Sequence, residues 1–506
     1  MSRLSAKAWL RSSLPIACFA VFALAAASLH QEEISRFVVE EEGPIPAALS
    51  HLLFGAPLGF ADAGMLQYFK MSKVRTADEA VERAVQGEAV PTHDLQMPID
   101  GVGIGPPLAD TIAFALFGPH ARSLLWLFLA LLGVSAGGYV LRFRNERLWV
   151  TPVFLAALTF LLLTFGMEGP RAVAEAPLGG ERSYILLAIL PMLHWCFELM
   201  SGKSRSRREA LFKGLLLGVQ VTILGFAILV RYSPICLIPT VLVSALLALR
   251  SGSAKRVAVL CLVPLAGLVI TLYGVVPLSF PAQAESGRLQ SLIWHRAFAG
   301  YGVNPEWPFP GVVEQYPCPQ VPQGGIVHRG ADSNAHCVWF AAPMNQARPA
   351  SEVWAELYGT RYEAVLRDAF FDVAVRYPGK TLATFLYYKP LMMVNATESS
   401  LIPRPAMPMD VAALAVLQFV LLAVFLAIEP AYGRGVSPRA GITIVTALVF
   451  FAFIPHLLAW TNPATGQELA AGAMCGAIVG VWLGCRTVLR AIWSANEDGR
   501  SNPRPP

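Results

Sequence analysis

Two carboxylates in one early segment are placed where they could do acid–base chemistry. Asp62 lies in GFADAGMLQYFKM, where its immediate neighbours are small or apolar, and Asp100 lies in PIDGVGIGPPL, where glycines and prolines impose tight turns. A carboxylate in apolar company has a shifted proton affinity, so it can act as a general base or help to bind a divalent cation. For Asp62 the alternative is a structural one, the N-cap of the helix that follows.

A second group of functional candidates lies in SLIWHRAFAGYGVNPEWPFPG. His295 can titrate near neutral pH, and Arg296 offers a planar fork of donors that fits a phosphate. A hydrogen bond to the loop backbone is the alternative role for His295. The aromatic residues of this stretch have flat faces suited to sugar rings or to a membrane interface. They are Trp294, Tyr301 and Trp307.

Further cations follow along the same part of the chain. Arg367 lies in a long amphipathic stretch (356–380), and Lys389 lies in FLYYKPLMM. Fixed cations can hold a phosphate while a group attached to it departs. An ordinary salt bridge is the alternative for most of the arginines. Arg296 and Lys389 are favoured as phosphate ligands because their neighbours are apolar or aromatic.

The composition of the chain decides what kind of protein must position these residues. The 506 residues are 55% hydrophobic and only 14% charged, with a mean hydropathy of +0.52. Soluble domains carry about a quarter charged residues. The chain is therefore expected to be a polytopic membrane protein. Its net charge of +5 comes from basic residues at the ends of apolar runs, which does not indicate a nucleic-acid partner.

Apolar runs long enough to cross a membrane as helices predict an all-α fold with about ten spans. The predicted spans are 14–29, 123–141, 149–167, 184–200, 214–230, 235–249, 257–276, 411–428, 442–460 and 470–488. Basic clusters follow every second crossing, which places both termini in the cytoplasm of a bacterial-type cell with an inner membrane. A cleaved signal peptide at the first span is the alternative, and its removal would leave nine spans.

This topology divides the chain into six parts. They are an N-terminal anchor (1–30), a first outer loop with surface helices (31–122), a membrane core (123–277), a second outer loop (278–410), three C-terminal spans (411–488) and a cytoplasmic tail (489–506). All the functional candidates fall in the two outer loops. Within the predicted spans, His194, Glu198 and His456 are the main ionisable residues, and we interpret them as helix-packing or interfacial groups.

Two cysteines share the second outer loop. Cys318 and Cys337 form an isolated pair in an oxidising compartment, and this predicts a disulfide. Two free thiols in a packed loop are the alternative. A metal site is not expected here, because HRGADSNAHC lacks the paired-cysteine spacing of structural zinc sites.

The block from Asp62 to about Phe143 resembles the start of the GT-C-type membrane glycosyltransferases, which include protein O-mannosyltransferase and lipid A aminoarabinose transferase relatives. The shared features are an acidic residue in the first outer loop, a PPL turn, a helix ending in LFG, and an arginine before a leucine-rich span. The resemblance implies ten to thirteen spans, a polyprenyl-phosphate sugar donor, and a first-loop acid that serves as base or metal ligand.

The predicted function is therefore transfer of a sugar from a polyprenyl-phosphate carrier to a lipid, glycan or protein on the outer face of the membrane. Asp62 or Asp100 would be the base or a cation ligand, with His295 near the reacting centre. Arg296, Lys389 and Arg367 would hold the donor phosphate. The expected partners are the lipid-linked sugar and membrane lipids. A surface-glycan polymerase or ligase is the first alternative, and a non-catalytic scaffold or lipid transporter is the second.

Overall fold

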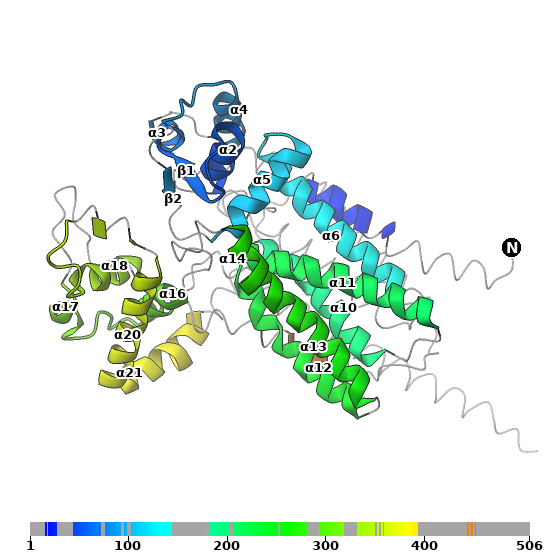
Figure 1. Cartoon of the computed structure of the whole chain (residues 1–506). Coiled ribbons are helices and arrows are strands. Elements are labelled where there is room, and N and C mark those ends of the chain that lie inside the picture. Colours follow the sequence, from blue (N-terminus) through cyan, green and yellow to red (C-terminus); the bar gives the residue numbers. More distant parts are fainter. Residues whose placement is uncertain are drawn as a thin grey trace, which may run out of the picture.

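The protein is described from a computed structural model (Figure 1). The described residues are 16–17, 19–27, 44–71, 76–92, 96–98, 103–143, 180, 183–201, 206–250, 253–280, 293–317, 331–349, 352–353, 356–357, 359–392, 443–444, 447–448 and 451. Within these ranges the chain forms a bundle of apolar helices and two smaller units, one from each predicted outer loop (Figure 1).

Three helices in the described part of the chain are long and apolar enough to cross a membrane. They are α6 (Arg122–Phe143), α11 (Arg207–Val230) and the continuous helix made of α13 (Ala254–Ile270), the π-helical turn η3 (Thr271–Val275) and α14 (Val276–Ser279). Each coincides with a predicted span.

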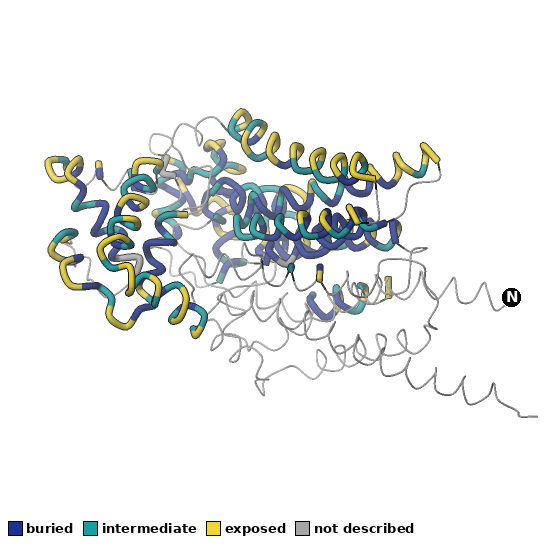
Figure 2. The backbone as a smooth tube through the Cα atoms, turned by 90° about the horizontal axis from the view of Figure 1, so that it is seen from below, coloured by how far each residue is buried: buried dark blue, intermediate teal, exposed yellow. Residues whose placement is uncertain are grey.

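Shorter apolar helices complete the described part of the bundle. They are α9 (Tyr184–Leu187), α10 (Ile189–Met200), the 3-10 helix η2 (Ser233–Leu237) and α12 (Pro239–Leu249). Almost every residue of α10 is buried, and Figure 2 shows burial concentrated along the centre of the bundle. Residues 19–27 are helical where the first span is predicted. The spans predicted at 149–167, 411–428 and 470–488, and most of 442–460, lie outside the described residues, so the count of ten stays a prediction.

The first-loop unit mixes helices with a small sheet. Its helices are α2 (Pro44–Phe54), α3 (Ala63–Met71), α4 (Ala77–Val85) and α5 (Gly105–Phe117). Strand β1 (Phe60–Asp62) pairs antiparallel with β2 (Gln96–Pro98), with Ala61 opposite Met97. The all-α prediction is therefore wrong for this unit. Three-residue strands are too short for an alternating pattern to reveal them.

Close packing joins this unit to the membrane helices. Helix α5 packs against α2, α6 and α11. A Cβ atom at Gly105 would lie only 2.0 Å from the carbonyl oxygen of Leu229, so the crossing of α5 and α11 requires glycine. A carboxylate adds a second link, because Asp78 in α4 accepts the backbone N–H of Ala121 at 2.8 Å, just before α6 begins. The unit is thus fixed to the end of the bundle where α6 starts and α11 ends.

The second-loop unit is helical with an aromatic core. It contains α16 (Ile293–Ala299), η4 (Gly300–Val303), α17 (Val312–Gln315), α18 (Ala331–Ala341), α20 (Thr360–Arg376), α21 (Pro378–Ala383) and the π-helical turn η5 (Thr384–Tyr388). Helix α16 packs against both α18 and α20. The largest buried side chains of the core are Phe298, Tyr301, Trp339 and Tyr362.

Candidate functional site

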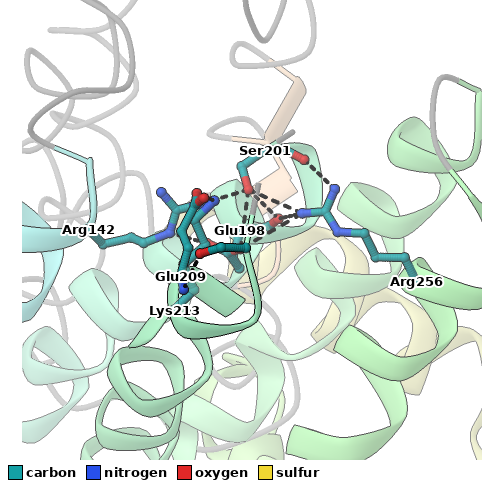
Figure 3. Close-up of polar contacts among 7 residues, drawn as sticks. Arg142, Glu198, Ser201, Glu209, Lys213 and Arg256 are labelled. Atoms are coloured by element: carbon teal, nitrogen blue, oxygen red, sulfur yellow. Dashed lines mark hydrogen bonds and ion pairs between the residues drawn. The ribbon is translucent and has the colours of Figure 1, made fainter. Parts of the chain in front are cut away.

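A group of paired charges closes one end of the helix bundle, and we call it the clasp (Arg142, Glu198, Ser201 and Arg256; Figure 3). Arg142 forms an ion pair with Glu198 and donates to the Ser201 hydroxyl at 2.9 Å. Arg256 donates to the backbone carbonyls of Ser201 (2.6 Å) and Glu198 (3.2 Å). These residues come from the last turns of α6 and α10 and the first turn of α13. The clasp therefore holds three helices together.

Two of the ionisable residues within the predicted spans, Glu198 and His194, contact neighbouring helices. Glu198 belongs to the clasp, and His194 lies one turn before it on α10, completely buried. The His194 ring contacts the rings of Tyr139 and Phe143, with centroid distances of 6.0 and 5.0 Å. These contacts agree with the interpretation of Glu198 and His194 as helix-packing or interfacial groups. His456 lies outside the described residues.

Asp62 is buried at the corner between β1 and α3. Its Oδ1 accepts the backbone N–H of Gly64 (2.8 Å) and of Thr92 (3.0 Å), and the Thr92 hydroxyl at 3.2 Å. Its own backbone N–H donates to the Ser50 hydroxyl at 2.9 Å. The bond to Gly64 is the helix-capping arrangement that the sequence offered as the alternative. Asp62 thus ties three segments of the first-loop unit together, and a catalytic role for it stays a prediction.

The predictions for Asp100 and for the Cys318–Cys337 pair involve residues that the structure does not describe. Asp100 and Cys318 lie outside the described residues. Cys337 is buried in α18 and is not among the free cysteines of the described chain, which are Cys196, Cys236 and Cys261. Its pairing with Cys318 stays a prediction. Within the described ranges, no three or more His, Cys, Asp or Glu side chains are grouped so that they could hold a metal ion.

His295 is held in place by residues of α20. Its Nδ1 lies 2.6 Å from the Tyr362 hydroxyl, and the side chain is largely buried. The two oxygens of Glu363 accept the backbone N–H groups of Trp294 (2.8 Å) and His295 (2.9 Å). The first turn of α16 would otherwise leave these N–H groups without helical partners. The Tyr362–Glu363 pair therefore orients both the imidazole and the helix that carries it.

Lys389 is a buried cation next to an aromatic ring. It is 0% exposed, and its Nζ lies 4.4 Å from the centre of the Phe385 ring. Burial disfavours the charged ammonium and lowers the pKa of Lys389 from 10.5 to about 7. Its charge near neutral pH therefore depends on its surroundings, and an anion close by would favour the protonated form.

A chain of aromatic contacts connects the N-terminal part of this unit to Lys389. Ring centroids are 5.8 Å apart between Trp294 and Phe370, 5.3 Å between Phe370 and Tyr301, and 5.4 Å between Tyr301 and Phe385. Tyr301 also stacks on Trp307 at 5.1 Å. Because Tyr301 is 0% exposed, it belongs to the core. Its predicted role in stacking on a sugar is not tested by this packing and stays a prediction.

The remaining candidates differ in their accessibility. Arg296 lies next to His295 on α16 and is half-buried. Trp294 and Trp307 are partly buried against the aromatic core. Arg367 projects from α20 with an exposed side chain and donates to neighbouring Asp368 at 2.9 Å. A neighbouring carboxylate reduces the charge that Arg367 can offer to a phosphate.

The structure thus brings most second-loop candidates into one unit, whereas Asp62 belongs to the other unit (Figure 1). The sequence did not single out Tyr362 and Glu363, or Ser50 and Thr92. The bonds of Tyr362 and Glu363 to α16 span 67 to 69 residues, and no local pattern signals such pairs. Thr92 binds Asp62 from 30 residues away for the same reason.

Comparison with known proteins gives one finding. No protein-family model matches the chain, and none of the curated proteins matches it. Among solved structures it is similar to ArnT from Cupriavidus metallidurans, crystallised with undecaprenyl phosphate, at 11% identity over 97% of this chain and 81% of that chain, with a TM-score of 0.34. A TM-score of 0.34 transfers no residue role, so the residues of this chain must carry any functional assignment.

Proposed function

We propose that this protein is an integral membrane transferase that moves a sugar from a polyprenyl-phosphate carrier to a lipid, glycan or protein acceptor at the outer face of a bacterial-type inner membrane. The distribution of charge supports this proposal. The clasp collects Arg142, Glu198 and Arg256 at one end of the described membrane helices, while the candidate reactive residues lie in the extramembrane units. Ion-coupled transporters instead place ionisable groups along the interior of the spans.

In this proposal the second-loop unit binds the donor. Arg296 and Lys389 hold the phosphate, because cations in aromatic, weakly hydrated surroundings attract an anion more strongly than cations in water. Arg367 contributes less to that site, since it already pairs with Asp368. His295 is oriented by Tyr362 and lies near the reacting centre. Trp294 and Trp307 offer ring faces to the sugar.

The first-loop unit supplies the acid–base group of the proposed mechanism. Asp62 or Asp100 accepts the proton of the acceptor nucleophile, or helps to bind a divalent cation. The same proposal places both termini and the clasp on the cytoplasmic side, since the basic clusters follow every second predicted span. It also retains ten spans and a disulfide between Cys318 and Cys337.

One observation favours a second candidate, a surface-glycan polymerase or ligase that needs no first-loop acid. The Oδ1 atom of Asp62 already accepts hydrogen bonds from Gly64 and Thr92, which is sufficient to explain why a carboxylate is there. His295 and Lys389 would then carry the chemistry without Asp62. Replacement of the carboxylates separates the two candidates.

Mass spectrometry of surface glycans and lipids tests the proposal. A strain without the protein is compared with strains restored by wild type, Asp62→Asn, Asp100→Asn, His295→Ala and Lys389→Met, after each variant is shown to accumulate in the membrane. The matched control is Asp78→Asn, because Asp78 is a first-loop carboxylate with a backbone-capping role.

Wild type and the Asp78→Asn variant should restore a missing glycosyl mass, while Asp62→Asn or Asp100→Asn should not. Restoration by both of the Asp62 and Asp100 variants, with failure of the His295 and Lys389 variants, would favour the polymerase or ligase. Identical glycan and lipid profiles in all strains would refute a transferase.

A further inference from the structure

The last helix of the second-loop unit has two contrasting faces. Helix α21 and the turn η5 continue without a break to residue 392. On the inward face, Lys389 and Thr384 are fully buried, and the Thr384 hydroxyl accepts a hydrogen bond from the Asn304 side chain at 2.8 Å. The outward face consists of Leu382, Leu386, Tyr387 and Leu391, which are exposed by 58, 72, 61 and 45%. We call these four residues the apolar face.

The apolar face carries no charge. Residues 378–392 contain only two charged side chains, Lys380 and Lys389. Lys389 is turned inward, and Lys380 pairs with Glu306 at 2.8 Å and lies over the ring of Phe309 at 5.1 Å. Helix α20 of the same unit is different, because charged residues such as Asp368 project from it into solvent. Contiguous exposed apolar surface of this kind marks an interaction site.

We propose that the apolar face lies in the outer leaflet of the bilayer, so that this helix is an interfacial anchor of the second-loop unit. The chain carries the unit close to the membrane at both ends. The membrane helix that precedes it ends at Ser279, and the next predicted span begins at residue 411, fewer than 20 residues after this helix. In Figure 1 the C-terminal end of this helix is the part of the unit that reaches towards the membrane helices.

The residue types also fit a lipid surface. Tyr387 and Tyr388 are adjacent, with ring centroids 5.1 Å apart, and tyrosine is enriched at the level of lipid headgroups. Leucines at positions 382, 386 and 391 follow one side of the helix, as in helices that lie in the plane of the interface. A second copy of the chain is a poorer occupant. Stable protein interfaces bury about 800 Å² on each partner, which four side chains cannot provide.

Insertion would hold Lys389, on the opposite side of the same helix, near the level of the phosphate headgroups. The proposal itself does not depend on transferase activity, and its test uses no activity measurement. Only exposed residues are changed, so the variants should fold.

Site-directed spin labelling of the full-length protein in lipid nanodiscs tests the anchor. A cysteine is introduced at Leu386 (Leu386→Cys) and, as the matched control, at Asp368 (Asp368→Cys), whose side chain is 70% exposed on α20. Protein without an added cysteine gives the background from native thiols. The measurement is the relaxation rate of the spin label. Its enhancement by oxygen, which concentrates in lipid, is compared with its enhancement by a water-soluble nickel chelate.

The label at position 386 should show an oxygen-to-nickel ratio several-fold higher than the label at position 368. Equal ratios at the two positions would place the apolar face in water and overturn the proposal. The label at position 386 could instead be protected from both reagents and show dipolar coupling to the label of a second chain. That result would assign the apolar face to a contact between two copies and would also overturn the proposal.

Discussion

The clasp and the second-loop unit both bury cations, but they control the charge in different ways. Arg142 and Arg256 share the carboxylate of Glu198, and Arg256 also donates to backbone carbonyls. Lys389 lies over the ring of Phe385, and its burial lowers its pKa to about 7. Arginine keeps its proton in almost any protein site, whereas lysine loses its proton readily when buried. The clasp therefore suits a permanent structural role, and Lys389 suits a site whose charge responds to a ligand.

The largest expected effect would come from opening the clasp. Glu198→Gln removes the carboxylate of the clasp and with it the ion pair to the buried guanidinium of Arg142. Loss of one partner of a buried ion pair costs about 3–5 kcal/mol. The free energy of unfolding should fall by that amount, with a lower midpoint of thermal unfolding in detergent.

A matched control for this prediction lies beside the clasp. Glu209 pairs with Lys213 at 2.7 Å, but its side chain is 35% exposed. Glu209→Gln should lower the free energy of unfolding by at most about 1 kcal/mol, because water screens a partly exposed pair. Equal effects of the two substitutions would contradict a structural role specific to the clasp.

Loss of the Lys389 charge should act on donor use rather than on folding. Hydrogen bonds to charged groups contribute about 1.5–3 kcal/mol, so Lys389→Met should lower kcat/KM for the lipid-linked donor by about 10- to 100-fold. The variant should still accumulate, since methionine fills the space among aromatic rings. Lys380→Met is the control, because Lys380 lies on the same helix and pairs with Glu306. A loss of the same size in the control would remove Lys389 from the proposed site.

Asp62 behaves more like the clasp than like Lys389, although it belongs to an outer unit. Asp62→Ala would leave the N–H groups of Gly64 and Thr92 without their acceptor, at a cost of about 1–3 kcal/mol. The oxygen of asparagine can accept the same bonds, so Asp62→Asn should change the free energy of unfolding much less. Denaturant unfolding of the two variants measures the difference. Activity that survives in Asp62→Asn would limit Asp62 to its capping role.

The sequence predicted features that depend on local pattern or charge placement. Apolar length predicted α6, α11 and the helix that ends in α14, and the position of Glu198 near a span end predicted a helix-packing or interfacial role. The three-residue strands β1 and β2 left no periodic signal. The core position of Tyr301 was also missed, because a flat ring suits a sugar, a membrane interface or a core equally well. Its contacts with Phe370 and Phe385 are 69 or more residues apart in the chain.

Control of the Lys389 charge by pH gives the sharpest contrast with the clasp. In the unfolded chain lysine binds a proton up to about pH 10.5, but folded Lys389 does so only below about pH 7. The unfolded state therefore binds more protons between these values, and Lys389 makes stability rise with pH across that window. In the proposed function, donor binding needs the protonated form, so kcat/KM for the donor should fall by up to about tenfold per pH unit above 7.

Stability and donor use should thus change in opposite directions as pH rises, which a general loosening of the fold would not produce. Lys389→Arg keeps its charge throughout, so its donor kcat/KM should lose the decline above pH 7. Thermal unfolding and initial rates from pH 6 to 9, for wild type and this variant, measure both trends. Bound donor phosphate favours the ammonium form of Lys389, so at saturating donor the decline should move to higher pH in wild type. If kcat/KM declines above pH 7 in Lys389→Arg as it does in wild type, a group other than Lys389 causes the decline. The difference in charge control between Lys389 and the clasp would then have no effect on donor use.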